Sequence, residues 1–268
     1  MAKAKGDVVK AWDNTIQDEL IAAGDRAAAV TQAEKKNYAE RLSRGLAQRF
    51  ADALRRHFDG ILPDASGKGQ ESKVRSAKGF KKLDVNYSTP ELGLGLGVSV
   101  KTINFVDPKT KRYTKNYTRA DAELRAEATD YHDRQPYAVM VAVVFLPMGS
   151  CDDGGKSAPS SFGQSVQIFR FRGGRAKPTD PSMLFERVLI GLYDTQTQTF
   201  GDVGFFDVMD APPKHGRPKR LLTFRQMVEA IVETYDARNR PTFGWADAEP
   251  EPVDLSATNG VAEDDDVE

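Results

Sequence analysis

An acidic residue and a short segment containing a lysine are separated by fourteen residues in the first half of the chain. Asp84 is followed, after residues 85–98, by Ser99, Val100 and Lys101. A carboxylate can bind a hard divalent cation, and a lysine beside that cation can orient or deprotonate a water molecule and offset negative charge. Phosphodiester hydrolysis needs these functions, because charge builds up on the phosphate as water attacks. Asp84 and Lys101 are therefore candidate catalytic residues.

Two predicted strands bring this acid and this lysine together. Residues 80–88 alternate between polar and apolar, which predicts a strand with Leu83, Val85 and Tyr87 on the buried face and Asp84 on the other.

A glycine-rich turn at residues 90–97 leads to a second predicted strand over residues 98–105. Because alternate side chains of a strand share a face, Ser99 and Lys101 point to one side, opposite to Val98 and Val100. We expect Asp84 and Lys101 to converge where the two strands lie side by side.

Further elements are predicted around this strand pair. A helix is expected over residues 31–58, because six apolar residues recur at every fourth position: Tyr38, Leu42, Leu46, Phe50, Leu54 and Phe58. A shorter helix is predicted before it from Trp12, Ile16 and Leu20. Thr118 and Asp121 have the spacing of a capping box that opens a helix ending near Asp133, with Leu124, Ala128 and Tyr131 inward. The apolar run from Tyr137 to Leu146 predicts a central strand buried on both faces.

The second half continues with a short helix near Phe162 to Phe169 and two strands over residues 187–193 and 203–208. A last helix is predicted to open at Thr223, with Gln226 at the capping-box position. The predicted fold class is α/β, a mixed central sheet flanked by helices. Residues 1–60 form an N-terminal helical segment that packs on the core, residues 61–245 the α/β core, and residues 246–268 a disordered acidic tail.

The order helix, Asp strand, lysine strand, helix and strand, over residues 71–147, resembles the PD-(D/E)xK nuclease superfamily, which includes many restriction endonucleases. The resemblance implies Asp84 as the main ligand of Mg²⁺ or Mn²⁺ and Lys101 as the catalytic lysine. It also implies the Val100 carbonyl as a further ligand, and a glutamate from the segment before the Asp strand, for which Glu71 is the matching candidate.

Ser99 departs from this pattern, because the superfamily has an acid at its position. A hydroxyl ligates Mg²⁺ weakly and without charge, so another carboxylate replaces it or the site is degenerate. The candidates for a second acid, in order, are Glu71, Glu127, Glu123 and Glu91. The alternative without catalysis is that Asp84 pairs with Lys82 or Lys101 on the sheet surface, or that Lys101 is a solvated strand lysine. In the same reading, Glu123 and Glu127 form a solvated helix face.

The distribution of charge favours a polyanionic partner. The chain has 38 Lys and Arg residues and 39 Asp and Glu residues, of which nine acids and no bases lie in residues 246–268. The remainder is therefore basic, which suits phosphate binding. The bases predicted to contact nucleic acid lie in segments 68–82, 109–119 and 170–177: Lys78, Lys81, Lys111, Arg112, Lys115, Arg119, Arg172 and Arg175. Segment 214–220 is a further basic loop.

Composition excludes several other classes. A single cysteine, Cys151, excludes a disulfide framework and a cysteine-based zinc site. Because the N-terminal residues lack an apolar stretch and no apolar run is long enough to span a bilayer, we expect a cytoplasmic protein without membrane contact.

The leading hypothesis is a Mg²⁺-dependent endonuclease of restriction and host-defence type, acting on double-stranded DNA as a homodimer so that two sites cut both strands. The alternatives are a catalytically degenerate nucleic-acid-binding protein on the same fold, and an assembly module that recruits a basic partner through its acidic tail.

Overall fold

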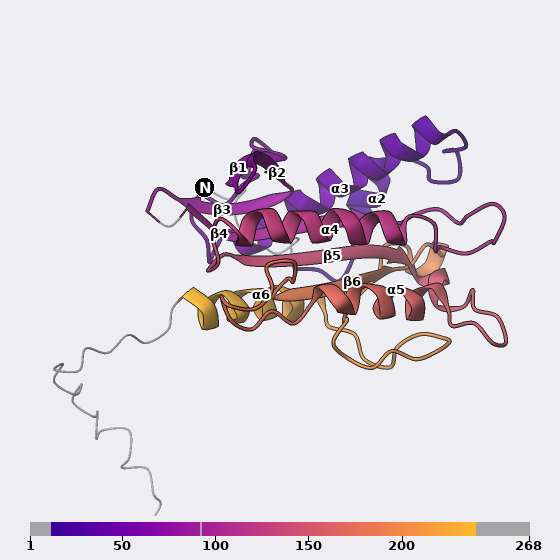
Figure 1. The fold of residues 1–268 in the computed structure, drawn as a ribbon. Helices are drawn as coiled ribbons and strands as arrows, with labels where there is room; N and C mark the ends of the chain where they lie inside the picture. The colour runs from indigo at the N-terminus through magenta and orange to yellow at the C-terminus, as the bar shows by residue number, and fades with distance from the viewer. Residues whose placement is uncertain (1–11, 92, 240–268) are drawn as a thin grey trace, which may run out of the picture.

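The computed structural model describes residues 12–91 and 93–239. A five-stranded mixed sheet lies between two layers of helices, which confirms the predicted fold class (Figure 1). The strands follow one another across the sheet in chain order: β3 (Val85–Thr89), β4 (Gly93–Thr102), β5 (Val139–Pro147), β6 (Arg187–Tyr193) and β7 (Val203–Asp207). The three central strands are parallel, and the edge strands β3 and β7 are antiparallel to their neighbours.

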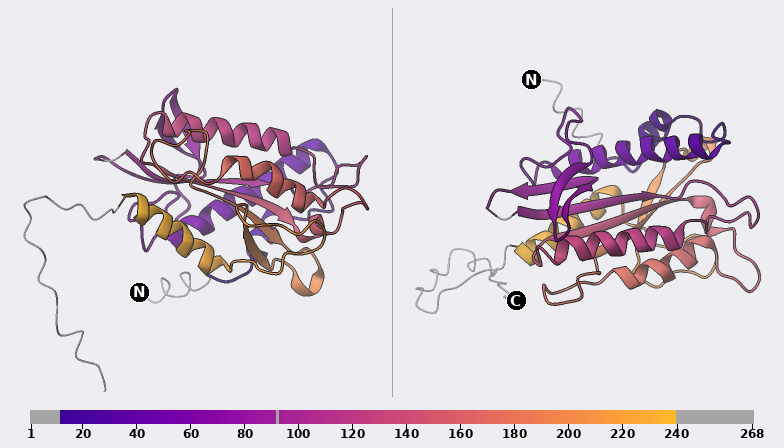
Figure 2. Two further views of the ribbon diagram at one scale, coloured as in Figure 1. Left: turned by 60° about the horizontal axis from the view of Figure 1, so that its bottom comes forward. Right: turned by 45° about the horizontal axis from the view of Figure 1, so that its top comes forward.

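Helices cover both faces of this sheet (Figure 2). On one face lie α3 (Gln32–Leu54), with the short α2 (Gln17–Ala23) packed against it, and α6 (Phe224–Asn239). On the other lie α4 (Tyr117–His132) and α5 (Ser161–Phe169). The described residues also include three short 3₁₀ turns: Met148–Cys151, Arg170–Arg172 and Thr197–Thr199. All nine residues of β5 are buried between the two helical layers, as expected for a central strand. Nowhere in residues 12–91 or 93–239 is a helix long and apolar enough to cross a membrane.

The long helix α3 follows its predicted pattern. Thr31 caps it, because its hydroxyl accepts from the N–H of Glu34 and the Glu34 carboxylate accepts from the N–H of Thr31. The six apolar residues at every fourth position are all buried in the core between α3 and the sheet. The preceding helix begins only at Gln17, so Trp12 lies outside it.

The start of α4 differs from its prediction. The N-cap is Asn116, in a left-handed conformation with φ 81°, and the predicted capping box of Thr118 and Asp121 does not form. Asp121 is engaged elsewhere, because its carboxylate pairs with the guanidinium of Arg172 at 2.7 Å. The inward face was predicted correctly, since Leu124, Ala128 and Tyr131 are buried. The capping box of α6 is confirmed: Gln226 N–H donates to the Thr223 hydroxyl at 3.2 Å, and Thr223 N–H donates to Gln226 at 2.9 Å.

The strand predicted over residues 80–88 is divided at Asp84. Its first part is β2 (Gly79–Leu83), which leaves the main sheet and pairs with β1 (Ser72–Ser76) in a separate hairpin. Its second part is β3. The prediction that Leu83 and Val85 share a buried face is therefore wrong: Leu83 packs in the core beneath α4, whereas Val85 packs in the core beneath α3. Asp84 forms the corner between the two sheets.

Candidate active site at the open edge of β4

The candidate site begins where β3 stops covering β4. The pairing of these strands starts at Val85 and Val98, so β4 continues beyond it paired with β5 alone along the length from Ser99 to Thr102. Side chains take the place of a strand at the edge left open. The backbone N–H of Val100 donates to Oδ2 of Asp84 at 2.7 Å, and the hydroxyl of Ser43, on α3, donates to the Val100 carbonyl at 3.4 Å.

Glu127, on α4, faces the same stretch of β4. Its Oε1 lies 2.5 Å from Nζ of Lys101, and its Oε2 accepts a hydrogen bond from the hydroxyl of Ser99. Glu127 is about one helical turn beyond Glu123, whose Oε2 lies 3.8 Å from the same lysine nitrogen. Among the acids considered as replacements for the one missing at position 99, Glu127 is the one that contacts both Ser99 and Lys101.

Glu71 lies near the site but has a different partner. It is one residue beyond the pair formed by Ser72 and Leu83, and so stands opposite Asp84 at the base of the hairpin. Its carboxylate accepts from Nζ of Lys82 at 2.6 Å, and its side chain is 42% exposed. This ion pair holds the pKa of Glu71 below its usual value.

The other two candidate acids are less well placed. Glu123 pairs with Arg119 at 2.7 Å on the surface of α4, which is the solvated arrangement considered as the alternative. Glu91 is exposed in the turn between β3 and β4, at the opposite end of these strands from Asp84. The structure therefore brings Asp84, Ser99, Lys101 and Glu127 together, with Glu71 and Glu123 at the margins.

Burial and neighbouring charges shift the ionisation of the two central groups. Burial raises the pKa of Asp84 to about 6, although the Val100 N–H and the charge of Lys101 oppose the shift. For Lys101 burial acts to lower the pKa, but the charges of Glu127 and Asp84 outweigh it and the pKa is raised. Lys101 is therefore a cation in this arrangement, suited to stabilising negative charge rather than to accepting a proton.

The oxygen donors of the site are sufficient for Mg²⁺ but not for a fully protein-ligated metal ion. Within the described ranges, no group of three or more His, Cys, Asp or Glu side chains is arranged to hold a metal ion. Mg²⁺ needs less, because it is commonly bound by one or two carboxylates and keeps several waters. Asp84 and Glu127 supply two carboxylates, and the Val100 carbonyl lies at the same open strand edge as Asp84. A cation there would compete with Lys101 for Glu127.

A groove of about 380 Å³ opens from Lys101 towards the beginnings of α3 and α4. One acid, Glu123, is among the residues that line it. The other charged lining residues are five bases: Lys35, Lys36, Lys101, Lys115 and Arg119. Two of these, Lys115 and Arg119, were predicted to contact nucleic acid.

Two residues of α3, Lys35 in the groove and Ser43 beside Val100, were not predicted from the sequence, because α3 was interpreted only through its apolar stripe. The signal was available, since Lys35, Ala39 and Ser43 recur at every fourth position on another face of the helix.

The remaining predicted phosphate contacts are divided between exposed and structural positions. Lys78 and Lys81, on the β1–β2 hairpin, pair with the buried carboxylate of Asp130, and Lys111 is exposed in the loop before α4. Arg112 donates to the Pro159 carbonyl, and Arg172 pairs with Asp121 between α4 and the turn after α5.

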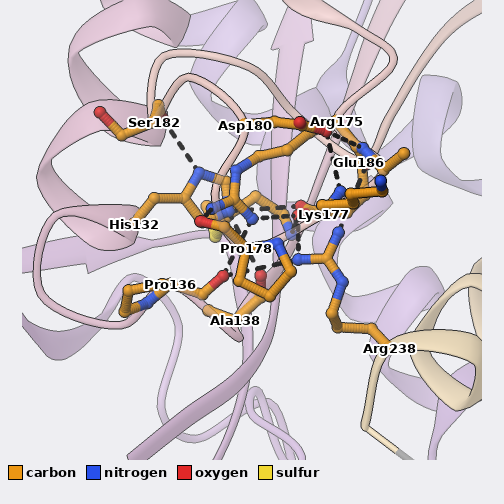
Figure 3. Close-up of polar contacts among 12 residues, drawn as sticks. His132, Pro136, Ala138, Arg175, Lys177, Pro178, Asp180, Ser182, Glu186 and Arg238 are labelled. Atoms are coloured by element: carbon orange, nitrogen blue, oxygen red, sulfur yellow. Dashed lines mark hydrogen bonds and ion pairs between the residues drawn. The ribbon is translucent and has the colours of Figure 1, made fainter. Parts of the chain in front are cut away.

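Arg175 requires a correction, because it is 3% exposed and cannot reach a polyanion at the surface. Its guanidinium pairs with Glu186 at 2.8 Å, and Glu186 also contacts Arg238 at 3.2 Å and His132 at 3.3 Å (Figure 3). A buried carboxylate surrounded by two guanidinium groups and an imidazole is a structural ion cluster. Arg175 has this role because its segment is folded inward against α6.

Comparisons of the chain with protein-family models, with curated proteins and with solved structures find no match. The geometry of the site is therefore the basis for assigning a function.

Proposed function

We propose that the protein is a Mg²⁺-dependent endonuclease that hydrolyses phosphodiester bonds in DNA, of the type used in restriction and host defence. The observation that carries the proposal is the convergence of Asp84, Lys101 and Glu127, from the corner before β3, from β4 and from α4, at one open strand edge. Apart from the β1–β2 hairpin, which lies between α3 and β3, the chain order α3, β3, β4, α4, β5 is also the order that the resemblance to the PD-(D/E)xK superfamily implies.

Each side chain has a defined part in this proposal. Asp84 and Glu127 would hold the metal, with Glu127 in place of the acid absent at position 99. The metal supplies charge stabilisation at the phosphate and a more acidic bound water. Ser99 orients Glu127 through its hydroxyl, and Lys101 offsets the negative charge that develops on the phosphate. The basic groove that begins at Lys101 would hold the neighbouring phosphates of the strand.

A plasmid-cleavage assay with and without Mg²⁺ tests the proposal. Wild type should cut only with the metal, and Lys101→Ala and Glu127→Gln should abolish cutting while retaining DNA binding. Glu123→Gln is the matched control, because it removes a neighbouring acid of the same helix that contacts Arg119 rather than Ser99. Equal loss in Glu123→Gln and Glu127→Gln would contradict the assignment of Glu127, and cutting by Lys101→Ala would contradict the site as a whole.

One observation favours a second candidate, a nucleic-acid-binding protein without catalysis. Both oxygens of Glu127 already have partners in Ser99 and Lys101, so this cluster is satisfied without a metal. Such a protein would bind DNA with strong salt dependence and cut none of it, with or without Mg²⁺.

A further inference from the structure

The β1–β2 hairpin presents one face to solvent and one to α4. In the pairing of its strands, Lys73 stands opposite Lys82 and Arg75 stands opposite Phe80, so these four side chains share the outward face. All four are exposed. The opposite face is anchored, because Val74 and Leu83 are buried in the core beneath α4 and Lys81 pairs with Asp130.

Phe80 is the unusual member of this outward face. Phe80 is 66% exposed, although it is a large apolar residue. The guanidinium of Arg75 lies over the ring, 5.7 Å from its centroid. Exposing a large aromatic ring to water is unfavourable. Among cations, such a ring offers a flat apolar surface to a partner that carries negative charge.

We propose that this face, formed by Lys73, Arg75, Phe80 and Lys82, is a second nucleic-acid contact, in which the bases bind phosphates and Phe80 stacks on a base or sugar. Charge complementarity supports a polyanion as the occupant, because three of the four side chains on this face are cations. Glu71 offsets one of these charges through its ion pair with Lys82. The aromatic ring favours nucleic acid over other polyanions, because stacking on bases adds to the attraction of phosphates.

The position of the hairpin adds to this argument. Along α4, Ala120 and Glu123 line the basic groove, Glu127 contacts Lys101, and Asp130 anchors the hairpin. The groove and the hairpin therefore lie on either side of the candidate catalytic residues, and a strand bound to both would pass over them. This inference rests on the proposed function, which makes the residues between the groove and the hairpin catalytic. The contact of the hairpin with nucleic acid can be tested without measuring cleavage.

The test measures binding of labelled single-stranded and duplex DNA by fluorescence anisotropy in EDTA, over a range of salt concentrations. Lys73→Gln and Arg75→Gln should each reduce the slope of log affinity against log salt by about 0.7 to 0.9, the amount expected for one lost phosphate contact. Lys156→Gln, which removes an exposed cation between β5 and α5, is the matched control and should leave the slope unchanged.

Phe80→Leu tests the stacking separately. It should weaken DNA binding roughly 5- to 100-fold without changing the salt slope, and should leave heparin binding unchanged because heparin has no bases. Thermal unfolding should be the same for all these variants, since the substituted side chains are exposed. DNA affinities and salt slopes equal to wild type in the three hairpin variants would overturn the inference, and would leave an acidic protein as the partner of this face. A wild type that binds DNA through the hairpin but never cuts it would contradict the proposed function alone.

Discussion

The backbone N–H of Val100 donates to the carboxylate of Asp84 over 2.7 Å, so the strand that carries Lys101 also holds the candidate metal-binding acid. Asp84 is therefore positioned by β4, the strand that carries Lys101, with which it is proposed to act. A shift of β4 relative to the corner at Asp84 would therefore move both groups together. The same hydrogen bond opposes the rise that burial causes in the pKa of Asp84.

The first prediction concerns stability. Because the pKa of Asp84 is about 6 in the folded protein and near 4 when unfolded, the folded state binds more protons between these values. Stability should therefore fall as pH rises from about 4 to about 6, and then remain lowered. Asp84→Asn, which can still accept from Val100, should be more stable than wild type at about pH 8 by roughly 1 to 3 kcal/mol, and similar at about pH 4. Urea unfolding of both proteins at the two pH values checks this, and an equal difference at both would contradict it.

The second prediction concerns the pH dependence of metal binding. A proton and a cation compete for Asp84, so the affinity for Mn²⁺ or Mg²⁺ should be nearly constant above its pKa and should decrease by about tenfold per pH unit below it. Isothermal titration calorimetry between about pH 5 and pH 8 measures this directly. In Asp84→Asn the residual affinity should lose this dependence; if it keeps the same dependence, another group is responsible.

A third prediction distinguishes the two acids ranked highest for the second metal position. Glu127→Gln should reduce cleavage by about 100-fold or more, as expected for loss of a group that acts on the developing charge. Glu71→Gln should reduce cleavage by less than about tenfold, because its exposed ion pair with Lys82 contributes little. Cleavage rates under single-turnover conditions measure both. The reverse order would return the metal-binding role to Glu71.

The fourth prediction separates a structural arginine from a phosphate contact. Arg175→Met would leave Glu186 with one fewer buried partner, and should destabilise the protein by roughly 3 to 5 kcal/mol without changing the salt slope of DNA binding while it remains folded. Arg119→Gln, which alters the rim of the basic groove, should instead reduce the salt slope and leave thermal unfolding nearly unchanged. A reduced salt slope in folded Arg175→Met would contradict the structural role.

The parts of the fold that were predictable are those in which one periodic pattern decides the outcome. The residues spaced by four from Tyr38 to Leu54 on α3, with Phe58 just beyond its end, allow one way of burying their side chains, and so does the unbroken apolar run of β5. The alternation of polar and apolar residues across Asp84 was misleading. The chain passes from one sheet to another at Asp84, so the apolar residues before and after it are buried against different helices although the alternation continues.

The candidate site was predictable to a similar extent. Asp84, Ser99 and Lys101 converge because neighbouring strands bring nearby segments together, as their spacing indicates. The contact of Glu127 depends on how α4 lies on the sheet, which local sequence does not specify, and so this residue could only be placed second among the candidates. The burial of Arg175 was not predictable at all, since its partner Glu186 precedes β6 and Arg238, the other guanidinium on Glu186, lies on α6, both later in the chain.

The corner at Asp84 has a consequence for how such a protein could diversify. Glu71 and Asp84 stand opposite one another at the base of the hairpin, so the chain returns to its point of departure after residues 72–83. An appendage that begins and ends at one place can change its length or surface residues while the sheet beneath it keeps its register. Under the proposed function, the residues of the hairpin that contact nucleic acid can therefore change while the residues proposed for chemistry remain in place.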